Sequence, residues 1–155
     1  MSKGPESNFW KQIRNNLPEK CFATRIENKH GGGVPDVHMV WDGKAFWFEL
    51  KVTKGNAVNI SPHQVAWNMA YYARGGSNFY LVKRAVDNHL FLFEGDQGPS
   101  LSQSGISGAE GHDFGSTCGS RCGFYTLRLN WLNKNRSSLM FERLLSRRLT
   151  AWNVF

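Results

Sequence analysis

The chain has 155 residues, of which 41% are hydrophobic and 20% are charged. This composition can supply one domain with its own core. No stretch approaches the roughly 18 consecutive apolar residues of a membrane span, and the N-terminus lacks an apolar signal-peptide core. Its three cysteines form no regular disulfide framework, which is typical of a reducing compartment. We therefore expect a soluble, cytoplasmic protein that makes no membrane contact.

The formal net charge of +7 is concentrated near the end of the chain. Residues 1–120 carry 12 Lys and Arg against 11 Asp and Glu, whereas residues 121–155 carry seven against one. A basic segment on a nearly neutral body indicates a polyanionic partner such as nucleic acid. The alternative is a solvated face that aids solubility, and charge alone does not separate the two.

The first half of the chain predicts a helix followed by three strands. Residues 5–16 form the helix, with apolar residues on one face and Glu6 on the same inward stripe. Residues 21–28, 34–41 and 44–53 form the strands, with a Gly-rich loop over 29–33 and an Asp-Gly hairpin turn at 42–43. In the third strand, Glu49 and Lys51 share one face, and alternate apolar residues fill the other: Phe46, Phe48, Leu50 and Val52.

The next helix has the clearest start signal in the sequence. Ser61 is a good N-cap, Pro62 suits the first helical position, and Gln64 completes a capping box. This helix is predicted to end near residue 73 or 74, with an inward apolar stripe made by Val65, Met69, Tyr72 and Ala73. Two further strands, 79–86 and 89–93, are joined by a tight turn.

These elements predict an α/β fold with a central mixed sheet and helices packed on its faces. Residues 1–94 are expected to form the core. The Gly/Ser-rich residues 95–123 are expected to be an irregular loop or insertion. Residues 124–155 are expected to be a basic C-terminal segment whose helix, from residue 137 or 138 to 149, packs on the core.

One constellation carries the chemistry. Gly33-Val34-Pro35-Asp36 opens the second strand, and Glu49-Leu50-Lys51 lies on the third. Two carboxylates and an ammonium that converge on neighbouring strands can hold a hard divalent cation and orient a water for attack on a phosphodiester. Singly, Asp36 is an ordinary turn residue and Glu49 an ordinary exposed strand residue. Together with Lys51 in register, they favour a metal site.

The order and spacing of these motifs resemble the PD-(D/E)XK nuclease superfamily, and within it the VRR-NUC domain family. The likeness covers roughly residues 5–84 and includes the segments 25–28 and 61–67. It implies a restriction-endonuclease-like αβββαβ core.

The resemblance also implies roles for individual residues. Asp36, Glu49 and the backbone carbonyl of Leu50 would bind Mg²⁺, for which Mn²⁺ would substitute. Lys51 would position the attacking water and stabilise charge on the phosphate. Glu6 would reach toward the metal, although Glu27 competes for the role of third carboxylate. Gln64 would support the site, although the capping box alone also explains it.

The function implied is that of an endodeoxyribonuclease for branched DNA, most simply four-way (Holliday) junctions, acting as a homodimer in DNA recombination and repair in a phage or bacterium. A flap, repair or restriction-type endonuclease would use the same site, and a DNA-binding module with a decayed site is the alternative from another class. The expected DNA contacts are Arg25, Lys29, His30, Lys54, His63, Arg128, Lys134, Arg136, Arg143, Arg147 and Arg148.

Overall fold

The computed structural model describes residues 4–17, 19–26, 32–41 and 43–116. Their elements, in chain order, are α1 (Pro5–Asn15), β1 (Phe22–Arg25), β2 (Val37–Trp41), β3 (Lys44–Thr53), α2 (Pro62–Tyr72), β4 (Asn78–Arg84), β5 (His89–Glu94), η1 (Gly95–Gln97), α3 (Gly98–Ser104), η2 (Ile106–Gly108) and β6 (Gly111–Ser116). Within these ranges, no helix is both long and apolar enough to cross a lipid bilayer.

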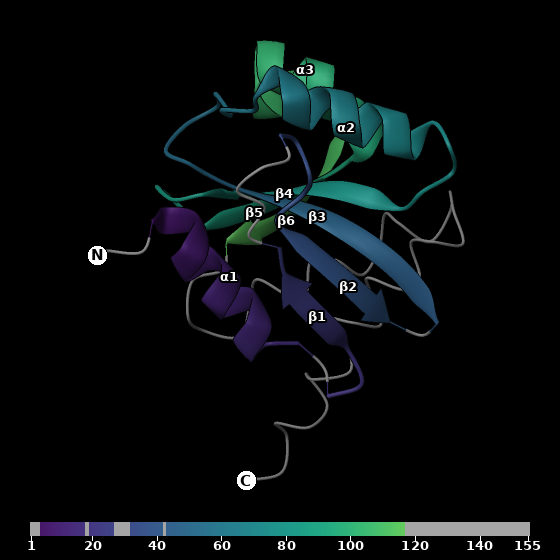
Figure 1. Cartoon of the computed structure of the whole chain (residues 1–155). Helices are drawn as coiled ribbons and strands as arrows, with labels where there is room; N and C mark the ends of the chain where they lie inside the picture. Colours follow the sequence, from purple (N-terminus) through teal and green to yellow (C-terminus); the bar gives the residue numbers. More distant parts are fainter. Residues whose placement is uncertain (1–3, 18, 27–31, 42, 117–155) are drawn as a thin grey trace, which may run out of the picture.

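The six strands form one mixed sheet whose spatial order follows the sequence from β1 to β6. Neighbouring strands are antiparallel except β3 and β4, which are parallel because α2 makes the crossover between them. Helix α1 lies on one face of the sheet, and α2 and α3 lie on the other (Figure 1). The predicted α/β fold, with helices on both faces of a mixed sheet, is therefore confirmed.

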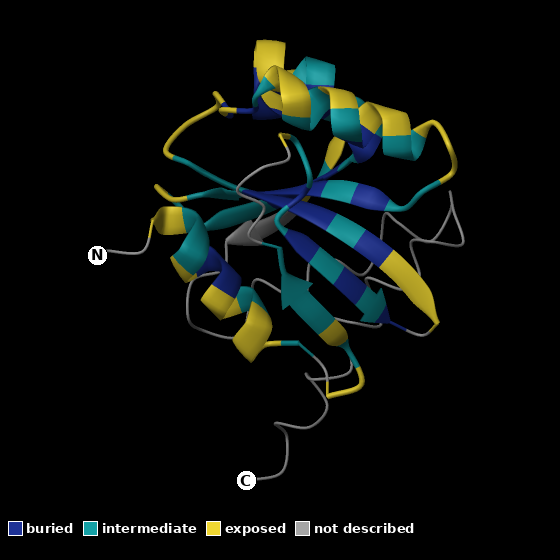
Figure 2. Ribbon diagram, in the orientation of Figure 1, coloured by how far each residue is buried: buried dark blue, intermediate teal, exposed yellow. Residues whose placement is uncertain are grey.

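The core beneath α1 follows from the period-2 pattern of the strands. Phe46, Phe48 and Leu50 point to this face of β3, as predicted, and are each at most 3% exposed. Helix α1 contributes Phe9 and Trp10, while alternate residues of β2 complete the same cluster. Along β2, buried residues alternate with partly exposed ones, and β3 follows this alternation from Phe46 to Phe48, after which Glu49 is buried as well (Figure 2). This packing fixes which face of β3 is left for Glu49.

The core beneath α2 and α3 corrects one prediction. Residues 95–116 were expected to be irregular, but they form two 3₁₀ turns, α3 and an edge strand paired with β5. Leu101 and Ile106 anchor this segment in a cluster that also contains Tyr80 and Phe93. Gly98 permits the close approach, because a Cβ there would lie 2.5 Å from the Tyr80 hydroxyl. The basic segment predicted over 124–155, with its helix from residue 137 or 138 to 149, lies outside the described residues.

The inward stripe predicted for α2 was partly wrong. Val65 packs against the core, but Met69 is 37% exposed and the buried residue of the helix is Asn68. Asn68 Nδ2 donates to the carbonyl of Gln64 at 2.9 Å. Asn78 Nδ2 donates to Asn68 Oδ1 at 2.7 Å. These bonds satisfy the side chain of Asn68 and the amide nitrogen of Asn78, while Asn78 Oδ1 has no hydrogen-bond partner among the described residues.

Candidate active site

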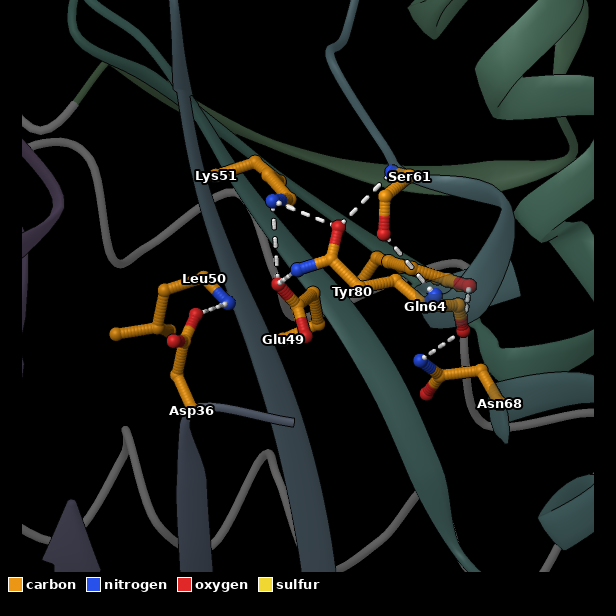
Figure 3. Close-up of polar contacts among 8 residues, drawn as sticks. All are labelled: Asp36, Glu49, Leu50, Lys51, Ser61, Gln64, Asn68 and Tyr80. Atoms are coloured by element: carbon orange, nitrogen blue, oxygen red, sulfur yellow. Dashed lines mark hydrogen bonds and ion pairs between the residues drawn. The ribbon is translucent and has the colours of Figure 1, made fainter. Parts of the chain in front are cut away.

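Four of the predicted site residues lie in one neighbourhood (Figure 3). Glu49 and Lys51 lie on the face of β3 that α2 covers, and Gln64 comes from the first turn of α2. Asp36 directly precedes β2, the antiparallel neighbour of β3. The strands and the helix thus bring together residues that are up to 28 positions apart in the sequence.

Glu49 is the most unusual group in this neighbourhood because it is an acid with only 1% of its surface exposed. Its Oε1 accepts from Lys51 Nζ at 3.1 Å and from Gln64 Nε2 at 2.5 Å. Its Oε2 is buried and has no hydrogen-bond partner in the part of the chain that the structure describes. A buried carboxylate oxygen without a partner carries a substantial desolvation cost, which a bound cation would remove.

The electrostatics of Glu49 point the same way. Burial raises the pKa of this carboxyl from 4.5 to about 8, and the negative charge of Asp36 adds to the increase. The ammonium of Lys51 acts in the opposite direction but does not outweigh these effects. Burial and the neighbouring acid thus disfavour the ionised form of Glu49, which a bound cation would favour.

Asp36 is fixed by the backbone of β3. Its Oδ2 accepts from the amide of Leu50 at 3.0 Å. The β2–β3 register pairs Val37 with Phe48, so its continuation places Pro35 opposite Leu50. Pro35 has no N–H to donate to the Leu50 carbonyl, and the amide and carbonyl of a strand residue point toward the same neighbouring strand. The Leu50 carbonyl therefore points to the side of β3 on which Asp36 lies.

Lys51 and Gln64 form a bridge over Glu49. Lys51 Nζ donates to Gln64 Oε1 at 3.2 Å as well as to Glu49, and its side chain is 12% exposed. Gln64 Oε1 also accepts from the amide of Ser61 at 3.0 Å, and the amide of Gln64 donates to Ser61 Oγ at 3.2 Å. The capping box and the contact with the site, which the sequence left as alternatives, are thus present in the same side chain.

Sequence reasoning did not assign a site role to three residues that hold Gln64 in place. Besides Ser61, the buried Asn68 and Tyr80 both donate to the Gln64 carbonyl, Tyr80 through its hydroxyl at 3.4 Å. The only signal was indirect: Asn68 follows Gln64 by four residues and shares its helix face. Tyr80 pairs with Glu49 across the β3–β4 ladder, a relationship that requires the sheet topology.

The Gly-rich loop has a packing role at Gly33. This residue has φ +92°, and a Cβ there would lie 2.2 Å from the backbone oxygen of His63. Only glycine adopts this conformation without strain and also fits against the first turn of α2. Gly33 therefore lets the chain pass against α2 immediately before Pro35 and Asp36.

The third carboxylate was predicted to be Glu6 or Glu27. Within the described ranges, no group of three or more His, Cys, Asp or Glu side chains is placed to share a metal. The charge of Glu6 is near enough to raise the pKa of Glu49 slightly, and its direct binding to a metal stays a prediction. Glu27 lies outside the described residues.

The donor set present fits Mg²⁺. Asp36, Glu49 and the Leu50 carbonyl supply oxygen donors, which hard divalent cations prefer. Mg²⁺ keeps several of its waters and is commonly held by one or two carboxylates, so a third acid is not required. The orphaned Oε2 of Glu49 is the observation that supports this fit.

The predicted DNA contacts divide into three groups. Lys54 and His63 are exposed, at the end of β3 and the start of α2 respectively. Arg25 is half-buried and donates to Ser7 Oγ at 2.9 Å, so it braces α1, and its contact with DNA stays a prediction. The others lie outside the described residues: Lys29, His30, Arg128, Lys134, Arg136, Arg143, Arg147 and Arg148.

No protein-family model and no curated protein matches this sequence. Among solved structures, the chain is similar to Hjc of Archaeoglobus fulgidus, a Holliday junction resolvase from an archaeal hyperthermophile. The TM-score is 0.46 and the identity 14%, over 59% of this chain and 75% of that chain. A likeness at this level leaves the function to be argued from the site itself, and membership of the VRR-NUC family stays a prediction.

Proposed function

We propose that this protein is a Mg²⁺-dependent endodeoxyribonuclease that hydrolyses phosphodiester bonds in branched DNA, with four-way junctions as its preferred substrate. One observation carries the proposal: the buried Glu49 has one oxygen held by Lys51 and Gln64 and the other without a partner, beside the charge of Asp36. A DNA-binding module with a decayed site would have no need to retain this buried and costly arrangement.

Asp36, Glu49 and the Leu50 carbonyl would hold the ion, and Mn²⁺ would substitute for Mg²⁺. When bound, the ion would supply positive charge to the scissile phosphate and lower the pKa of a water. Asp36 lies directly before β2 and Glu49 lies on β3. Each acid is held by a further contact, Asp36 by the Leu50 amide and Glu49 by Lys51 and Gln64. Such fixed donors cost little reorganisation during the reaction.

Lys51 is the group that would meet the developing charge on the phosphate. Its ammonium has three N–H donors, of which two point to Glu49 Oε1 and Gln64 Oε1. Its side chain is partly accessible, so the third donor can serve a phosphate oxygen or the attacking water. Gln64 fixes this orientation through the capping box of α2. An ammonium aimed in this way stabilises negative charge that builds up in the transition state.

Selection of branched DNA would come from features beyond the site. We propose a homodimer that presents two sites to paired strands, with the basic residues 121–155 contacting phosphates. Sedimentation that shows only monomer at micromolar concentration would contradict the two-site geometry.

The test is a cleavage panel of four-way junction, flap, nicked duplex and linear duplex, each with and without Mg²⁺. We expect the wild type to cut the junction, and Asp36→Ala and Lys51→Met to lose cleavage while retaining DNA affinity. Lys83→Met is the matched control, since Lys83 is a partly exposed lysine of β4 that donates to Gln12 of α1, outside the site. Preferred cutting of a flap or a linear duplex would reassign the substrate, and DNA binding without Mg²⁺-dependent cutting of any substrate would contradict the proposal.

A further inference from the structure

Four aromatic rings form a continuous row that starts beside the candidate active site. The centroids of His38 and Trp47 are 4.8 Å apart, and those of Trp47 and Trp67 are 5.5 Å apart. The Trp67 and Tyr71 rings stack at 4.9 Å with an interplanar angle of 11°. The row thus crosses from β2 through β3 to α2.

The row shares its face with the site. Trp47 lies two residues before Glu49 on β3 and therefore points to the same side of the sheet. Trp67 and Tyr71 follow Gln64 by three and seven residues, so they continue the same stripe of α2. The Glu49–Gln64 contact and the Trp47–Trp67 contact are consequently successive contacts between β3 and α2.

These rings are not part of the hydrophobic core. Each of the four residues is partly exposed. Neither core cluster, as far as the described residues define them, includes any of the four. The Tyr71 ring is nevertheless held in place, because it packs so closely on Gly76 that a Cβ there would lie 2.1 Å from the ring. The row is therefore a preformed aromatic surface next to the site.

The charge of the surrounding elements favours a polyanion over a basic or neutral partner. Strands β1, β2 and β3 and helix α2 contain only one carboxylate, the Glu49 of the site itself. The exposed Arg74 follows Tyr71 by three residues, just beyond α2, and places a basic group near that end of the row. Rings that stack bases beside cations that attract phosphates are the combination by which proteins bind single-stranded nucleic acid.

We propose that the row formed by His38, Trp47, Trp67 and Tyr71 is a stacking surface for unpaired bases of the DNA substrate at its branch point. This inference rests on the proposed function for its choice of DNA, and it deepens that function by naming what distinguishes the substrate from plain duplex. Bases splayed out of a junction expose the π-faces that aromatic side chains bind, whereas those in a duplex are stacked on each other.

The test measures binding in EDTA, so that cleavage does not enter. Fluorescence anisotropy would compare a junction carrying unpaired thymidines at its branch point with a linear duplex of the same length. Since stacking contributes about 1–3 kcal/mol per base, Trp67→Ala and Tyr71→Ala are expected to weaken junction binding about fivefold or more. Their affinity for the duplex should be unchanged. Met69→Ala is the matched control, because Met69 is exposed on α2 but lies outside the row.

The conservative variants Trp67→Phe and Tyr71→Phe retain a ring and should retain most of the junction affinity. They also test the proposal where an alanine variant fails to fold. In addition, a loss of DNA affinity caused only by misfolding would be the same for junction and duplex. An equal loss on junction and duplex, or no loss on either, would overturn the proposal. The proposal would also be overturned if light scattering showed that the alanine variants change from dimer to monomer and that this change accounts for all of the lost affinity. The row would then be a subunit interface.

Failure of this inference is distinguishable from failure of the proposed function. If the wild type prefers the junction with unpaired thymidines in EDTA but cuts no substrate with Mg²⁺, only the nuclease proposal is contradicted. If the wild type cuts junctions, but the Trp67 and Tyr71 variants keep the wild-type affinity and the wild-type preference for junction over duplex, only the stacking surface is contradicted. Asp36→Ala should keep the preference for unpaired bases, since Asp36 does not belong to the row.

Discussion

Replacing Glu49 by Gln is expected to stabilise the metal-free protein increasingly as the pH rises. The pKa of Glu49 increases from 4.5 to about 8, first through burial and then through the charge of Asp36. A folded-state pKa above the unfolded value means that stability is full below about pH 4.5 and is lost as the pH rises through about 8. At about 1.4 kcal/mol per pKa unit, ionisation of this one group removes about 4 kcal/mol by pH 8.

The assay is urea unfolding in EDTA at a series of pH values from below 4.5 to above 8, for wild type and Glu49→Gln. Other titrating groups cancel in the difference between the two free energies of unfolding, which should grow with pH by up to about 4 kcal/mol. Glu110→Gln makes the same exchange at an exposed position and serves as control. Mg²⁺ should narrow the difference at high pH by binding the wild type. A difference that is constant across the pH series would refute the reasoning.

Four further predictions follow from the same geometry. Gln64→Ala is expected to cost about 1 kcal/mol of stability through the lost cap and to lower kcat about 10- to 100-fold, whereas Ser61→Ala should cost similar stability with a smaller effect on kcat. Gly33→Ala should lower Tm and cleavage, and its loss of folding stability should exceed the roughly 1–2 kcal/mol that a side chain costs at a left-handed backbone position. Gly43 also has a positive φ, +74°, but a Cβ there would have no atom within 4 Å, so Gly43→Ala should show the backbone cost alone. Calorimetry should find Mg²⁺ affinity falling about tenfold per pH unit below about pH 8, because the ion must displace a proton from Glu49; affinity independent of pH would contradict this. Affinity for DNA should fall about 10³-fold or more between 50 and 200 mM salt if the basic residues 121–155 contact phosphates, and unchanged affinity would exclude that role.

The sequence predicted the elements with strong periodicity or explicit end signals. Strand β3 was predicted with its observed bounds because alternating aromatic residues and flanking turns define it, and the start of α2 was predicted from Ser61, Pro62 and Gln64. The segment after Glu94 was missed because its composition is typical of loops. Glycine at position 98 indicates flexibility when only composition is considered, but here it allows the backbone to pack against Tyr80.

The candidate site was predictable as a set of residue types but not as a network. The spacing of Glu49 and Lys51 places them on one face whatever the topology. The hydrogen bond from the Leu50 amide to Asp36 depends on the β2–β3 register, which only the paired strands reveal. The burial of Glu49, and hence its raised pKa, depends on how α2 is laid across β3.

The carboxamide of Gln64 both caps the start of α2 and hydrogen-bonds to Glu49 and Lys51. Fraying of the first helical turn and disassembly of the site are therefore a single local opening event. Amide hydrogen exchange at the start of α2 would report directly on the fraction of molecules with an assembled site. Selection for a firmer helix start and selection for a competent enzyme would then act on the same side chain.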